Sequence, residues 1–294
     1  MKRSVTEVIR GGYDLTIANW PLLLLRIAEH LLVAMLAIAS IVAIIVPIAV
    51  SAGLGHFTLD QPGGVDDARE IILGLLAQHW LLLLFILLLI TVVLVVIVAL
   101  HSFVQAGCAQ VYLDRSFSID RFLAGGKRGW LPVFWIYNLA WLVAGVVLLV
   151  PILPIPFLIA LTGESTGSIV VGCVLLALWA FFAVIVALAT ALWSMKAIVV
   201  SMTRNLDARA SLKEARQAIR AEPGPHFAVG FIMLVIWLGG TALIGTMSGV
   251  MSIGHATPLA LITAPLQIVI SLINAIFSSA LESWFLASFI SMES

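Results

Sequence analysis

Long continuous runs of apolar residues dominate the chain, and shorter polar segments separate them. The apolar runs lie at about residues 21–50, 80–106, 131–150, 169–195, 227–249 and 259–285. A transmembrane helix needs about 20 apolar residues to cross about 30 Å of hydrocarbon, and each run meets this requirement. The runs are rich in Leu, Ala and Ile and lack the alternation of a membrane β-barrel. The pattern therefore predicts an all-α, polytopic membrane protein with six transmembrane helices.

A proline-rich sequence, PILPIP at 151–156, follows the third run. Proline has no backbone N–H, and its ring clashes with the preceding helical turn, so three prolines in six residues cannot continue a helix. We expect the third span to end here. The alternative is a broken helix that dips back into the bilayer.

Composition agrees with the membrane class. Of the 294 residues, 62% are hydrophobic and only 10% are charged, whereas soluble domains average about 25% charged residues. This balance excludes a water-soluble enzyme, a disulfide scaffold and a disordered tail. Cys108 and Cys173 fall in or beside apolar segments, without a CxxC pattern, so we expect two small buried or lipid-facing thiols.

The basic residues are distributed unequally between the two sides of a six-span arrangement. Thirteen of the fifteen lie in segments 1–20, 107–130 and 196–226, which share one side. The other side carries Arg69 with Asp60, Asp66, Asp67, Glu70 and Glu164. Loops rich in Lys and Arg stay in the cytoplasm, so both termini are expected to be cytoplasmic, in a bacterial inner membrane. Interfacial tryptophans are expected at the cytoplasmic ends (Trp20, Trp130, Trp193, Trp284) and at an external end (Trp80).

The three basic segments resemble one another. Each contains a serine suited to start a helix, at Ser4, Ser118 and Ser211, and in the first and third units Glu7 and Glu214 follow with capping-box spacing. The glycine pairs at 11–12 and 125–126 share one offset from their serines and are predicted to end short helices.

This repeat predicts a single transmembrane domain over 1–294, built as three hairpins that each follow a short cytoplasmic interfacial helix. The units would be 1–106, 107–195 and 196–294. Ordinary basic loops are the alternative. Because anionic lipid attracts each nearby basic residue by about 1 kcal/mol, we expect the short helices to contact the inner leaflet. The candidate lipid contacts are Arg10, Arg121, Lys127, Arg128, Lys213, Arg216 and Arg220.

The alternation of short helices and hairpins, with AIVVSMTRNLDARASLKEARQAIRAE at 197–222 leading into a span, resembles a group of bacterial six-span membrane proteins. The group includes the membrane domain that precedes some glycerophosphodiester phosphodiesterases, together with stand-alone relatives of unknown function. The resemblance covers nearly the whole chain as a pattern. In the enzymes of this group a separate soluble barrel performs the chemistry, and because the sequence has no such segment we expect no phosphodiesterase activity.

Ionisable residues inside a span are the first candidates for function in a membrane protein. Arg26, Glu29 and His30 lie on one face of the first predicted helix, and Glu282 closes the last span at the same predicted side. Glu282 would meet Arg26 if the first and last hairpins were neighbours. As a helix, the first apolar run would be about 45 Å long, which is longer than the hydrocarbon layer requires. The surplus length allows these ionisable residues to lie among the lipid head groups. The alternative is that they lie within the hydrocarbon layer and form a proton or substrate path. His101 and Gln105 are predicted at the inner interface.

No catalytic, metal-binding or nucleotide-binding motif occurs in the sequence, so no enzyme activity, cofactor, metal or nucleic-acid partner is expected. The first interpretation is a non-catalytic scaffold, accessory subunit or lipid-interacting protein. Its partners would be membrane lipids, another membrane protein or further copies of this chain. The alternative is a small-molecule or lipid transporter that uses the polar cluster of Arg26, Glu29, His30 and Glu282.

Overall fold

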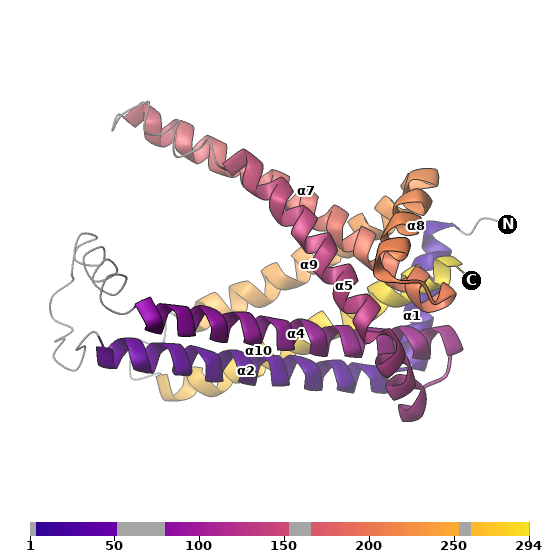
Figure 1. Ribbon diagram of the computed structural model, residues 1–294, viewed down its shortest axis with the longest axis horizontal. Coiled ribbons are helices and arrows are strands. Elements are labelled where there is room, and N and C mark those ends of the chain that lie inside the picture. The colour runs from indigo at the N-terminus through magenta and orange to yellow at the C-terminus, as the bar shows by residue number, and fades with distance from the viewer. Residues whose placement is uncertain (1–3, 52–79, 153–165, 253–259, 294) are drawn as a thin grey trace. The chain divides into compact units, whose positions relative to one another are not determined.

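The computed structural model describes residues 4–51, 80–152, 166–252 and 260–293. Throughout these ranges the secondary structure is helical, without a strand. The helices are α1 (Val5–Ala18), α2 (Pro21–Ser51), α4 (Trp80–Asp114), α5 (Ile119–Ile152), α7 (Thr166–Arg204), α8 (Ala208–Ala221), α9 (Pro223–Ser252) and α10 (Ala260–Glu293) (Figure 1). α5 ends at Ile152 in the described chain, and the choice between a span end and a broken helix after it concerns residues outside the described ones. The acidic residues expected on the external side also lie outside them.

Six helices are long and apolar enough to cross a membrane, namely α2, α4, α5, α7, α9 and α10. The prediction of six membrane-spanning helices is therefore confirmed for length and composition. These helices are longer than the apolar runs in the sequence: α4 continues to Asp114, α7 to Arg204 and α10 to Glu293. With 39 residues, α7 is about 58 Å long, well beyond the roughly 30 Å of hydrocarbon that a span must cross.

The chain divides into two compact units. The larger unit contains residues 1–27 and 102–294, and the smaller unit contains residues 28–101. The smaller unit is thus formed by most of α2 and the first two thirds of α4. The three repeat units that the sequence suggests have other boundaries and stay a prediction.

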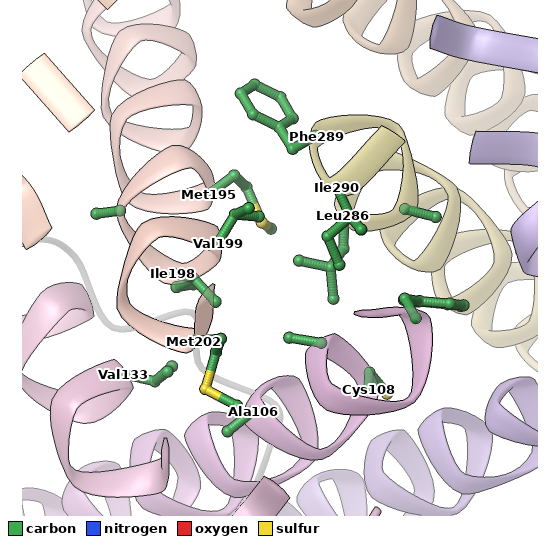
Figure 2. Close-up of a cluster of buried hydrophobic side chains, with 14 of the residues drawn as sticks. Ala106, Cys108, Val133, Met195, Ile198, Val199, Met202, Leu286, Phe289 and Ile290 are labelled. Atoms are coloured by element: carbon green, nitrogen blue, oxygen red, sulfur yellow. The ribbon is translucent and has the colours of Figure 1, made fainter. Parts of the chain in front are cut away.

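The hydrophobic core of the larger unit lies where α4, α7 and α10 extend beyond their most apolar stretches. Figure 2 shows Met195, Ile198, Val199 and Met202 of α7, Leu286, Phe289 and Ile290 of α10, Ala106 and Cys108 of α4, and Val133 of α5 in this core. Phe181 of α7 and Leu243 of α9, nearer the opposite ends of their helices, are 68% and 66% exposed. In a membrane such side chains contact lipid, so protein packing is concentrated at one end of the spans.

The short helices α1 and α8 use their apolar faces for packing within the protein. α1 buries Val8, Gly12 and Thr16 and packs against α10. α8 packs mainly against α7 and buries the residues Ala208, Ser211, Leu212 and Ala215. The indole N–H of Trp284 donates to the Ile9 carbonyl (2.8 Å), and that of Trp193 donates to the Leu212 carbonyl (2.8 Å). These two tryptophans, expected as membrane anchors, hold the short helices in place.

The helix starts agree with the sequence in the first repeat and differ in the third. The Ser4 hydroxyl accepts from the Glu7 amide (3.3 Å) and the Glu7 carboxylate accepts from the Ser4 amide (2.7 Å), which is the predicted capping box. α8 instead begins after Asp207, whose carboxylate accepts from the Ala210 amide (2.8 Å). Ser211 is buried inside α8, so its predicted capping role is wrong.

The expected helix ends at the glycine pairs are also wrong. α1 continues past Gly12 to Ala18, and α5 runs without interruption from Ile119 through Gly126, so the second short helix is the beginning of a span. These glycines instead lie at close helix contacts. A Cβ on Gly12 would lie 2.7 Å from the Ser288 backbone, and one on Gly126 would lie 2.6 Å from the Phe103 ring.

Candidate functional site

Arg26 is the centre of a buried polar network in the larger unit. Its side chain, in the second turn of α2, is fully buried. One guanidinium nitrogen lies 3.0 Å from the Glu282 carboxylate of α10, and the other terminal nitrogen donates to the Gln105 side-chain carbonyl of α4. The Gln105 amide in turn contacts the Met195 sulfur of α7 at 3.3 Å. The contact between Arg26 and Glu282 that the sequence suggested is therefore present, and four spans meet at this network.

Helix lengths indicate how deep this network lies. If the hydrocarbon layer ends at Ser51, about 20 residues of α2 cross it and the opposite boundary falls near Leu31. The same reasoning from Trp80 along α4 places the boundary near Leu100. Arg26 and Gln105 then lie just outside the hydrocarbon, among the head groups. The helix lengths therefore favour a shallow position for Arg26 over one at the bilayer centre, where a charge would cost about 2.5–3.5 kcal/mol or more.

Glu29 and His30 belong to the smaller unit. The Glu29 carboxylate lies 2.6 Å from the His101 ring nitrogen Nδ1, and only 6% of Glu29 is exposed. The second Glu29 oxygen, Oε2, has no hydrogen-bond partner among the described residues. His30 is partly buried next to it in the sequence. Sequence reasoning placed His101 and Gln105 at the interface without a role. Both residues follow Trp80 by about 20 positions, which places them at the same predicted membrane depth as residues 26–30. This shared depth was the sequence signal for these contacts.

A largely apolar cleft of about 480 Å³ lies in the larger unit between α5, α7, α9 and α10. Its wall includes small residues, Ala187 and Ala191 of α7 and Gly230 of α9, and the aromatic residues Trp141, Trp237 and Phe285. Ser278 and Glu282 of α10 contribute a hydroxyl and a carboxylate to its lining, so the Arg26–Glu282 ion pair adjoins the cleft. No pattern in the sequence singled out this cleft, because its four walls come from distant segments.

The predicted lipid contacts are all exposed: Arg10, Arg121, Lys127, Arg128, Lys213, Arg216 and Arg220. Two of them also bind the protein, since Arg128 donates to the Gln110 side chain (2.7 Å) and Arg121 to the Ser116 carbonyl (3.4 Å). On α8 the spacing of four and three residues brings Arg209, Lys213, Arg216 and Arg220 onto one exposed face, here named the basic stripe. The sequence-based set omitted Arg209.

Comparison with known proteins adds no relative. No family model, curated protein or solved structure matches this chain. The likeness to the six-span membrane domains therefore stays a prediction, and the function must be inferred from the geometry. Within the described ranges no three His, Cys, Asp or Glu side chains come together as metal ligands. Cys108 is buried and Cys173 is exposed.

Proposed function

We propose that this chain is a non-catalytic integral membrane protein that binds a membrane lipid. The observation that carries the proposal is the cleft between α5, α7, α9 and α10, whose lining is largely apolar and includes the carboxylate of the Arg26–Glu282 ion pair. Its volume of about 480 Å³ lies in the range of small-ligand sites, about 300–1,000 Å³.

A lipid acyl chain fits this cleft better than a water-soluble ligand does. The walls come from membrane-spanning helices, and the neighbouring apolar side chains, such as Leu238 and Leu142, are exposed. In a membrane this region is surrounded by lipid. Apolar side chains that line an empty gap lack van der Waals partners on one side, so a hydrocarbon chain that enters the cleft gains contacts with them. The Ser278 hydroxyl and the Glu282 carboxylate offer hydrogen bonds to the polar end of the lipid.

The Ala187→Phe variant is expected to lower the amount of lipid that co-purifies with the protein. The ring would occupy the volume of the acyl chain and weaken lipid retention roughly tenfold, which corresponds to about 1.4 kcal/mol of lost contact. Lipid extracted from the protein in mild detergent and quantified by mass spectrometry measures this effect. Ala189→Phe is the matched control, because Ala189 is an exposed residue of the same helix outside the cleft. Equal lipid content in both variants would contradict the assignment.

A small-molecule or lipid transporter is the second candidate, and the Glu29–His101 contact of 2.6 Å favours it. Buried ionisable pairs in spans commonly belong to ion or proton pathways. A transporter would lose proton-coupled uptake in reconstituted vesicles when Glu29 is replaced by Gln, whereas lipid retention in the cleft would be unaffected. A scaffold or accessory subunit would instead co-purify with another membrane protein or assemble with further copies of this chain.

The proposed location is the bacterial inner membrane, with both termini in the cytoplasm. The support is the charge distribution, since segments 1–20, 107–130 and 196–226, which share one side of a six-span arrangement, carry thirteen of the fifteen basic residues. A cysteine introduced at Lys213, in a background with Cys108 and Cys173 replaced by Ser, is expected to react with a membrane-impermeant maleimide only after cell lysis. Reaction in intact cells would reverse this orientation.

We further expect the basic stripe to bind anionic head groups of the inner leaflet. Four exposed cations lie on one face of α8, and a nearby anionic surface attracts each by about 1 kcal/mol. Replacing Arg209, Lys213, Arg216 and Arg220 with Gln should therefore abolish any enrichment of anionic over zwitterionic lipid around the purified protein, measured by native mass spectrometry from mixed nanodiscs. The control replaces Arg115, an exposed basic residue outside the stripe and outside the predicted lipid contacts, with Gln. A preference that the fourfold variant retains would refute the role of this surface.

A further inference from the structure

A second pocket, of about 390 Å³, lies between the last turns of α7, one face of α8 and the end of α10. It is charged where the cleft is apolar. Its polar lining consists of Lys196 and Arg204 of α7, Glu214 and Gln217 of α8, and Glu293 of α10. None of these residues belongs to the lipid-binding cleft, and none was a candidate from the sequence.

The charges of this pocket are paired across helices. The Lys196 ammonium binds the Glu293 carboxylate, and Arg204 donates to the Glu214 carboxylate at 2.6 Å. Lys196 is only 4% exposed, although burying a charge is costly unless its hydrogen bonds are made. The pocket therefore holds two cations on α7 that face two anions from α8 and α10.

Hydrogen-bonding capacity remains on both sides of these pairs. An ammonium has three donors and a guanidinium five, yet within the described chain Lys196 and Arg204 each have one hydrogen-bond partner. Each carboxylate uses one oxygen in its pair, and the Gln217 amide makes no hydrogen bond to the described residues. Unused hydrogen-bond donors thus lie on α7, and unused acceptors lie on α8 and α10. A ligand with only a negative charge would be repelled by the two carboxylates, and a ligand with only a positive charge would be repelled by the two basic groups.

We propose that this pocket binds a zwitterion of the phosphoethanolamine class, in which a phosphate ester carries a primary ammonium group. The phosphate oxygens accept hydrogen bonds from Lys196, Arg204 and Gln217. The ligand's ammonium donates to the free oxygens of Glu293 and Glu214. Charge-assisted hydrogen bonds of this kind are about twice as strong as neutral ones.

The position of the pocket along α7 is compatible with a lipid head group as the source. Counting about 20 residues from Val170, where the apolar span begins, the hydrocarbon ends near Thr190. Lys196 lies six residues further, about 9 Å beyond this boundary and at the level of the head groups. A free phosphoethanolamine ester in the aqueous phase carries the same chemistry.

The experiment uses the full chain purified in detergent and follows its thermal unfolding through tryptophan fluorescence. O-phosphoethanolamine is expected to raise the unfolding midpoint, whereas phosphocholine, inorganic phosphate and ethanolamine are not. Phosphocholine has no N–H to donate to the carboxylates, and the other two ligands each have only one of the two charges. In parallel, native mass spectrometry from nanodiscs is expected to show phosphatidylethanolamine retained over phosphatidylcholine. Retention of the lipid alone identifies the membrane as the source, and an effect of the free ester alone identifies a soluble ligand.

Two variants test the assignment to this pocket. Lys196→Met and Gln217→Leu, the second at an exposed position, are each expected to weaken binding about tenfold or more. Thr6→Leu is the matched control, because Thr6 is an exposed polar residue of α1 outside the pocket. An equal effect of phosphocholine or inorganic phosphate, no binding of either ethanolamine ligand, or unchanged binding in Gln217→Leu would overturn the proposal. Ala187→Phe alters the cleft and leaves the charged pocket unchanged. The proposal for the cleft and the proposal for the charged pocket can therefore be refuted independently of each other.

Discussion

Replacement of Arg26 by methionine is expected to lower the free energy of unfolding by about 3–5 kcal/mol. Arg26 is fully buried and binds both Glu282 and Gln105, so its loss leaves a carboxylate and an amide carbonyl without their cationic partner. Removing one partner of a buried ion pair lowers the free energy of unfolding by far more than the intact pair contributes to it, because the remaining charge stays desolvated. The midpoint of thermal unfolding in detergent, followed by the fluorescence of the nine tryptophans, measures this loss.

A double variant separates the charge effect from a packing effect. Arg26→Met combined with Glu282→Leu removes both charges and is expected to recover most of the lost stability, because apolar replacements of a buried pair are often neutral or stabilising. Arg209→Met, on the exposed basic stripe, should change stability by less than about 0.5 kcal/mol. If Arg26→Met were as stable as Arg209→Met, the network would have no structural role.

The membrane-spanning helices were predictable because each is encoded locally, as a run of apolar residues long enough to cross the hydrocarbon. The extensions of α4 to Asp114 and of α7 to Arg204 were not, because polar residues appear there and the hydropathy pattern ends. These turns are helical because distant segments cover them. Met195 and Met202 of α7, for example, pack in the same core as Leu286 of α10.

The candidate site was predictable only in part for the same reason. Arg26 and Glu29 lie three residues apart, and local spacing suggested one cluster on one helix face. Their contacts instead come from tertiary structure: Arg26 binds Gln105, 79 residues away, and Glu29 binds His101, 72 residues away. The cleft and the charged pocket combine four and three helices respectively, so no single segment carried a signal for them.

Gly12 and Gly145 are expected to respond in opposite directions to the same substitution. Gly12→Ala places a methyl group 2.7 Å from the backbone N and Cα of Ser288, where no side-chain rotation relieves the clash. Overpacking of this kind costs about 1–3 kcal/mol, which should exceed the roughly 1 kcal/mol by which alanine favours a helix over glycine. Gly145 lies inside α5 with nothing within 4 Å of its Cβ position, so Gly145→Ala should stabilise the protein by about 0.5–1 kcal/mol.

The position of α1 distinguishes this clash from a general loss of stability. Because α1 is held on α10 through Gly12 and the Trp284–Ile9 hydrogen bond, Gly12→Ala should separate the two helices before the spans unfold. Limited proteolysis should then cut within α1 much faster than in the parent protein, whereas Gly145→Ala should leave the cleavage rate unchanged. Since both variants exchange one helical glycine for alanine, helix propensity alone predicts that both gain stability. A stabilised, protease-resistant Gly12→Ala protein would mean that α1 does not approach α10 at this glycine.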